Sequence, residues 1–170
     1  MQLYFMRHEL AEDWETWKGE DFDRPLTRKG KERLARSAAR LAALELRPDA
    51  IVSSPLLRAW STAQVLSEHL DRACCLYRDE RLAPGFGPQA LRALLADHPD
   101  AGRLLLVGHE PDFSGTIAAL TGARVVCKKG SLARVDLDPG VNRPQAGENG
   151  ESLPLSGRLV WLLPPKVLAL

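Results

Sequence analysis

The sequence lacks an excess of charge of either sign, a long apolar run and a leader-like N-terminus. Its 23 basic and 22 acidic residues leave a net charge of +1, so no overall basic field favours nucleic acid or an anionic membrane as a partner. No apolar stretch approaches the roughly 20 residues of a membrane span. The N-terminus does not have the charged-then-apolar pattern of a secretory signal. We therefore expect a cytoplasmic protein that binds neither nucleic acid nor membrane.

Cysteine is also scarce, with only Cys74, Cys75 and Cys127 in 170 residues. No two of them have the C-x-x-C spacing of a thioredoxin-like site or of a zinc site. Neighbouring cysteines rarely bridge each other, so the pair at 74 and 75 does not indicate a disulfide. We predict reduced thiols that lie mostly in the core.

What the sequence does contain is an alternation of short apolar runs with amphipathic segments. Segment 28–46 places Leu34, Ala38 and Leu41 on one helical face, and Thr27 is a suitable N-cap. The whole pattern predicts strands at 2–6, 49–54, 73–78, 103–108, 131–137 and 157–163, and helices at 28–46, 55–70, 88–98 and 111–122.

This alternation is typical of the α/β class. We predict a single three-layer domain over residues 1–170, with a largely parallel central sheet and helices on both faces. The run at 103–108 is almost wholly apolar, as expected for a strand covered on both sides. Residues 138–156 are rich in glycine, proline, asparagine and glutamate, and we expect a mobile loop there.

Polar side chains follow three of the predicted strands at the point where each strand ends. Arg7 and His8 follow the first strand, Ser53 and Ser54 follow the second, and His109 follows the fourth. Arg58 lies in the first turn of the helix after the second strand. Ligands of open α/β sheets bind outside the carboxyl ends of the strands. The sequence therefore predicts that these side chains meet at one edge of the sheet.

Two arginines and two histidines at one edge suit a dianionic phosphoryl group. The planar guanidinium fork matches phosphate oxygens, one histidine can act as a nucleophile toward phosphorus, and the other can stabilise charge on the transferring group. A metal site built from His8 and His109 is a weaker interpretation. Arg7 and Arg58 would repel a cation, and the sequence has no H-E-x-x-H motif.

Four stretches in the same order resemble the histidine phosphatase superfamily and its phosphoglycerate mutase-like fold. They are "LYFMRHE", "DRPLTRKG", "SSPLLRAWSTAQV" and "LLLVGHEPDFS", within residues 2–137, and "RPLT" and "VGHEP" are most similar to SixA-type phosphohistidine phosphatases. The resemblance implies that His8 is the nucleophile that becomes phosphorylated. It implies that Arg7 and Arg58 clamp the phosphate, that His109 contacts the phosphoryl oxygens, and that Ser53 lines the pocket. It implies no metal and no organic cofactor.

Two positions depart from the family pattern. Glu9 replaces the glycine of the usual R-H-G, so its carboxylate is a candidate pocket wall or acid, or else an outward-pointing surface group. Many relatives also carry a glutamate general acid after the third strand, where this chain reads "RDERLAPGFG" and places Pro84. Glu80 is a nearby candidate for that role. An alkoxide needs a proton to leave, whereas an imidazole with a pKa near 6.5 leaves more readily. The missing acid therefore favours phosphohistidine over an alkyl phosphate.

Residues and resemblance together predict a cofactor-free phosphatase that acts on phosphohistidine in a protein and releases inorganic phosphate. A phosphorelay or phosphotransfer protein is a suitable substrate. Two alternatives stay open. One is a small-molecule or phosphoserine/phosphothreonine phosphatase of the same superfamily, although the acidic segment 9–24, with seven acidic and two basic residues, should repel small polyanions. The other is a non-catalytic module that binds phosphohistidine or phosphate, with turnover lost through Glu9.

Overall fold

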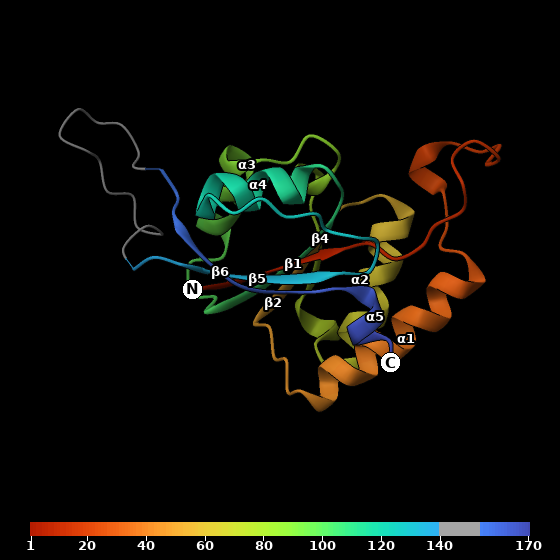
Figure 1. Ribbon diagram of the computed structural model, residues 1–170, viewed down its shortest axis with the longest axis horizontal. Coiled ribbons are helices and arrows are strands. Elements are labelled where there is room, and N and C mark those ends of the chain that lie inside the picture. Colours follow the sequence, from red (N-terminus) through yellow and green to blue (C-terminus); the bar gives the residue numbers. More distant parts are fainter. Residues whose placement is uncertain (140–153) are drawn as a thin grey trace.

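The computed structural model describes residues 1–139 and 154–170, and a six-stranded sheet forms the centre of this part of the chain (Figure 1). The spatial order is β3-β2-β4-β1-β5-β6. The first four strands in this order run parallel, β5 runs antiparallel to β1, and β6 runs antiparallel to β5. The strands are β1 (Gln2–Arg7), β2 (Ala50–Ser53), β3 (Leu76–Arg78), β4 (Arg103–Gly108), β5 (Leu132–Leu137) and β6 (Gly157–Leu163). The predicted α/β class with a largely parallel sheet is confirmed.

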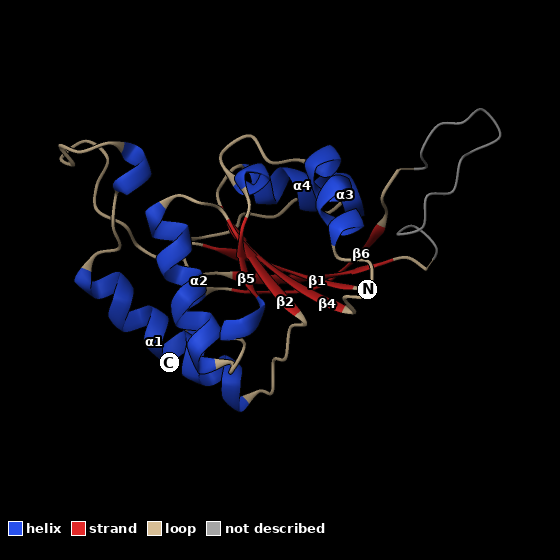
Figure 2. Cartoon of the chain, turned by 180° about the vertical axis from the view of Figure 1, so that it is seen from behind, coloured by secondary structure: helices blue, strands red, loops and turns tan. Residues whose placement is uncertain are grey.

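Helices cover both faces of the sheet (Figures 1 and 2). One face carries α1 (Arg28–Ala43), α2 (Leu57–His69) and the short α5 (Pro165–Leu168), and the other carries α3 (Pro88–Asp97) and α4 (Asp112–Thr121). The hydroxyl of Thr27 accepts a hydrogen bond of 2.9 Å from Gly30 N, which caps α1 as the sequence predicts. Short 3-10 helices lie at Asp21–Asp23, Ala73–Cys75 and Glu80–Leu82. No helix among the described residues is long and apolar enough to cross a membrane.

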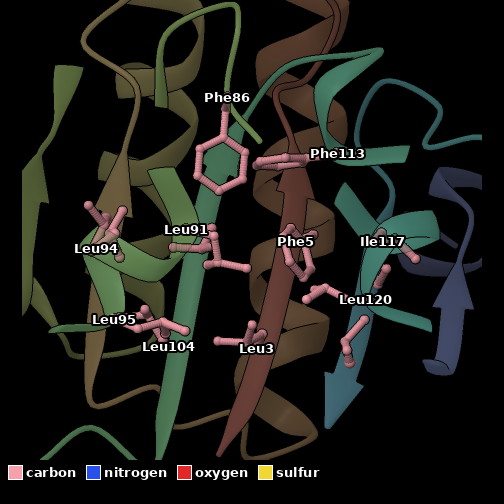
Figure 3. Close-up of a cluster of buried hydrophobic side chains, with 14 of the residues drawn as sticks. Leu3, Phe5, Phe86, Leu91, Leu94, Leu95, Leu104, Phe113, Ile117 and Leu120 are labelled. Atoms are coloured by element: carbon pink, nitrogen blue, oxygen red, sulfur yellow. The ribbon is translucent and has the colours of Figure 1, made fainter. Parts of the chain in front are cut away.

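The core consists of two hydrophobic clusters, one on each face of the sheet. Successive side chains of a strand point to opposite faces, so Leu3 and Phe5 of β1 join the cluster under α3 and α4, while Tyr4 and Met6 join the one under α1 and α2. Figure 3 shows Phe5 beneath the aromatic ring of Phe113, which meets it edge-on at 5.2 Å between ring centroids. Burial on both faces fixes β1 firmly, and its carboxyl end is therefore a rigid support.

Several predicted boundaries differ from the structure. Helix α2 begins at Leu57, so Pro55 lies outside it, and α4 begins at Asp112, one residue after Pro111. The strand predicted at 73–78 is regular only over its last three residues, because in the described part of the chain β3 is an edge strand whose one neighbour is β2. The preceding turn leaves Cys74 exposed, so the expectation of mostly buried thiols is wrong there. The predicted mobile loop at 138–156 falls largely on residues 140–153, which lie outside the described residues.

Candidate active site

The strand order brings the predicted site residues to one edge of the sheet. Strand β4 lies between β1 and β2, so His109 after β4 stands between His8 after β1 and Ser53 at the end of β2. The His8 and His109 rings are 5.3 Å apart between centroids. Arg58 projects from the second residue of α2 and is buried. The topology thus assembles residues from four separate segments into one polar site.

Backbone contacts fix the orientation of His8. Its amide donates to Gly108 O at 3.1 Å, and its Nδ1 lies 2.7 Å from Glu9 O. A carbonyl oxygen can only accept, so Nδ1 carries the hydrogen and Nε2 keeps its lone pair. The residue as a whole is 5% exposed. In the other imidazole, Nε2 of His109 and Oγ of Ser54 share a hydrogen bond of 2.8 Å. His8 is therefore held in a tautomer suited to nucleophilic attack.

Both imidazoles are held in the neutral form. Burial, more than any other influence, lowers the pKa of His8 well below 6.5, and the nearby His109, Arg58 and Arg7 lower it further. Burial lowers the pKa of His109 to about 4, with Arg58 as the next cause. Each ring is neutral at pH 7, and a neutral imidazole is the nucleophilic form.

The two arginines present buried donors to the same site. Arg7 Nη1 donates to Cys127 O at 2.9 Å. Arg58 Nη1 and Nη2 donate to the backbone oxygen and the carboxylate of Asp21, at 2.8 and 3.0 Å. The Nε groups of both arginines are buried without a hydrogen-bond partner in the described part of the chain. Buried donors are normally satisfied, so two orphaned guanidinium donors indicate a site for an anion with several acceptor oxygens.

Sequence reasoning missed one residue that touches this constellation, Asp21, and assigned the pocket-lining role to Ser53 although it had placed both Ser53 and Ser54 at this edge. Asp21 binds Arg58 through two oxygens, and its carboxylate also pairs with Arg24 at 2.8 Å. Nothing in the sequence separates Asp21 from the other six acidic residues of segment 9–24. Ser54, rather than Ser53, contacts His109, because the Ser53 hydroxyl turns to Ser54 O at 2.9 Å. Only the contact itself distinguishes these adjacent serines.

Glu9 is completely buried, but its carboxylate bonds on the side of α1. Oε2 accepts from Leu10 N at 2.7 Å, and Oε1 lies 3.0 Å from Arg33 Nη2 as an ion pair. The Gly130 backbone packs directly against this carboxylate. Burial raises the pKa of Glu9, while Leu10 N–H and Arg33 oppose that rise. Through these contacts Glu9 links the end of β1 to α1 and to the segment before β5. It is therefore a buried structural contact and not an exposed surface group.

The carboxylates near the expected acid position are exposed or bonded elsewhere. Glu80 is exposed. Asp79 accepts from Arg81 N and pairs with the Arg81 guanidinium, which lowers the pKa of its carboxyl. Asp112 accepts from Gly85 N at 2.8 Å. Among residues 1–139 and 154–170, no three His, Cys, Asp or Glu side chains gather as a metal-binding group.

Comparisons with known proteins show which family and which solved structures this chain is similar to. Residues 3–84 match the model of the histidine phosphatase superfamily, branch 1. An uncharacterized protein of Picosynechococcus is 38% identical over 175 residues, covering 96% of this chain and all of that protein. Two solved structures share the fold over 98% of both chains. They are the protein histidine phosphatase SixA complexed with tungstate (TM-score 0.79, 23% identity) and a mutant phosphoserine phosphatase of Entamoeba histolytica complexed with phosphoserine (TM-score 0.69, 15% identity).

Proposed function

The chain belongs to the histidine phosphatase superfamily, branch 1, and from this premise we propose that it is a metal-independent phosphatase acting on phosphohistidine in a protein. A phosphorelay or phosphotransfer protein is a suitable substrate. The observation that carries the proposal is the pair of buried Nε donors of Arg7 and Arg58 beside two neutral imidazoles. Cationic guanidinium groups and neutral imidazole rings at one edge of the sheet suit a phosphoryl group that is first bound and then attacked by a nucleophile.

In the first step, Nε2 of His8 attacks the phosphorus in line with the leaving group. The P–Nε2 bond forms while the bond from phosphorus to the substrate imidazole breaks. The substrate ring leaves as a neutral imidazole when its other nitrogen is already protonated from solvent. Phospho-His8 keeps its Nδ1–H, so its ring is an imidazolium cation that carries the phosphoryl dianion, and the Glu9 carbonyl 2.7 Å from Nδ1 stabilises the ring. Arg58 exchanges the Asp21 carboxylate for phosphoryl oxygens as the substrate binds.

In the second step, water attacks phosphorus on the face that the leaving group has left. The P–Nε2 bond breaks, inorganic phosphate forms, the proton of the water passes to phosphate or solvent, and His8 returns to its neutral form. Arg7, Arg58 and His109 contact the equatorial oxygens in both steps, Arg58 once it has released the Asp21 carboxylate, and these donors stabilise the charge of the transition state. No step requires a metal ion.

The surroundings of the carboxylates favour a phosphoramidate substrate. Glu9 is bound to Leu10 and Arg33, Glu80 is exposed, and the Asp21 carboxyl has a lowered pKa, so it is a poor proton donor at neutral pH. An alkoxide leaving group needs such a donor. An imidazole leaving group, with an ordinary pKa near 6.5, does not.

The test compares three substrates in metal-free buffer: a protein carrying phosphohistidine, a phosphoserine peptide and a small phosphate ester. We expect the highest kcat/KM for phosphate release from the phosphohistidine protein. A higher kcat/KM on phosphoserine or the ester would replace the substrate assignment with the small-molecule or phosphoserine/phosphothreonine alternative. Tight binding of the phosphoprotein without any phosphate release would overturn the enzyme assignment in favour of a binding module.

The pH profile of kcat/KM should lack the usual histidine limb near pH 6.5. The nucleophile must be neutral, and burial lowers the pKa of His8 well below 6.5 and that of His109 to about 4. Since kcat/KM reports the free enzyme, we expect it to stay level as the pH falls through 6.5 and to decline only in more acidic buffer. In the unfolded chain the same histidines have ordinary pKa values and bind protons at a higher pH than in the folded protein. The free energy of unfolding should therefore also decrease as the pH falls below 6.5. A midpoint at pH 6.5 or above would contradict neutral, buried imidazoles.

A further inference from the structure

A basic pocket lies beside the candidate active site, where α5 packs against α1. In Figure 1 the C-terminal helix α5 lies next to α1 on the same side of the sheet, and contacts between the two helices confirm the packing. The cavity measures about 340 Å³. We call it the basic pocket; its lining includes Arg33, Arg36, Lys128, Lys166, Pro164 and Pro165.

Within the described residues, three of its four cations form no ion pair with a carboxylate. Arg33 is paired with the buried Glu9. Arg36 uses Nε to donate to Ala169 O at 3.1 Å, which links α5 to α1, and its charge acts on the Glu9 carboxylate without forming an ion pair with it. Lys128 and Lys166 are exposed, and within the described residues no carboxylate oxygen lies within 4.0 Å of Arg36, Lys128 or Lys166. A chain of net charge +1 thus concentrates positive charge at one concave place.

The same short segment connects this pocket to the phosphoryl site. Cys127 O accepts from Arg7, the next residue is Lys128 of the basic pocket, and Lys129 O accepts from Arg33. Gly130 N then donates to the backbone oxygens of Arg7 and His8. Backbone groups of segment 127–130 therefore bind Arg7, His8 and Arg33, while Lys128 of the same segment lines the basic pocket. A protein bound through its phosphohistidine would reach both.

From this juxtaposition we infer that the basic pocket docks an acidic patch of the phosphoprotein substrate, formed by aspartate or glutamate side chains near the phosphohistidine. This inference rests on the proposed function and specifies its substrate class. Charge complementarity at the rim of a site speeds association and selects partners. Contacts in the basic pocket also favour the binding of a protein substrate. A small phosphate compound occupies only the phosphoryl site and cannot make these contacts.

The test uses the double variant Lys128→Glu/Lys166→Glu, whose side chains form no hydrogen bond or ion pair within the described residues. The matched control is Arg47→Glu/Arg158→Glu, which changes the net charge equally at the opposite end of the sheet, before β2 and at the start of β6. For the phosphohistidine protein at low salt, we expect KM to rise about tenfold in the pocket variant with kcat unchanged. Added salt should narrow the difference, and turnover of the small phosphoramidate ion should match wild type.

Two results would overturn the docking role. One is an equal change of KM in the pocket variant and the control. The other is a parallel loss of phosphoramidate turnover, which would show damage to the phosphoryl site. If wild type releases no phosphate from the phosphoprotein, the proposed function itself fails. Binding of a fluorescent poly-glutamate peptide then tests the docking role of the basic pocket separately. Weaker binding by the pocket variant than by the control supports this role, and equal binding contradicts it.

Discussion

Replacing His8 with alanine is expected to abolish phosphate release, lowering kcat by at least about a thousand-fold. Alanine removes Nε2, the atom that forms the bond to phosphorus, and no neighbouring group can take its place. His109 stands close, at 5.3 Å between ring centroids, but its Nε2 is already engaged with Ser54 Oγ at 2.8 Å. Steady-state phosphate release and trapping of an acid-labile phosphoenzyme measure the effect together.

The matched control is His69→Ala, the same change at an exposed histidine near the end of α2, where Nδ1 contacts Val65 O. This variant should retain wild-type turnover and phosphoenzyme formation. Folding of both variants is checked by their unfolding midpoints. Release that persists in a folded His8→Ala protein, with phosphate still trapped on the enzyme, would assign the nucleophile to another residue.

Local patterns were enough to predict most of the secondary structure, but not the order of the strands. The apolar runs and the capped segment after Thr27 specify their own conformation, and β1, β4 and α1 are found close to their predicted places. That β4 lies between β1 and β2 depends on contacts between residues far apart in the chain. The predicted length of the edge strand β3 is too great for a related reason. Within the described residues its length depends on pairing with one neighbour, β2.

The site divides in the same way between local and long-range information. Arg7, His8, Arg58 and His109 could be singled out because each follows a strand or opens a helix, and parallel strands share one carboxyl edge. The surroundings of Glu9 could not be predicted, since its partner Arg33 and the packed Gly130 are distant in sequence. The link between Arg58 and Asp21 likewise depends on how segment 9–24 folds back over α2.

The contact between Gly130 and Glu9 leads to the largest expected effect on stability. Gly130 has a φ of 81°, and a Cβ built there would lie 2.6 Å from Glu9 Cδ. The carboxylate cannot move aside, because it is completely buried and held by Leu10 N and Arg33. Gly130→Ala should therefore lower the free energy of unfolding by about 3 kcal/mol or more, from backbone strain and a disrupted buried ion pair. Urea denaturation measures it.

Gly122 provides a control with the same backbone strain and no clash. Its φ is 72°, and a Cβ there would meet no atom of the described residues within 4 Å. Gly122→Ala should lower the free energy of unfolding by only about 1 kcal/mol, the strain of a left-handed alanine. Equal losses at both positions would show that the Glu9 carboxylate yields easily and does not fix the segment before β5.

Combining Gly130→Ala with Glu9→Gly separates the clash from the strain. Glu9→Gly restores the glycine typical of the family, empties the space beside Gly130 and leaves Arg33, whose side chain is 20% exposed, able to turn toward water. The double variant should lose about 2 kcal/mol less free energy of unfolding than the two single variants lose together. Such a coupling is expected of residues in direct contact. Additive losses would contradict the contact. A loss smaller than the sum would show that the glutamate at position 9 and the glycine at position 130 require each other. This chain would then tolerate the departure from R-H-G only because Gly130 leaves room for the Glu9 carboxylate.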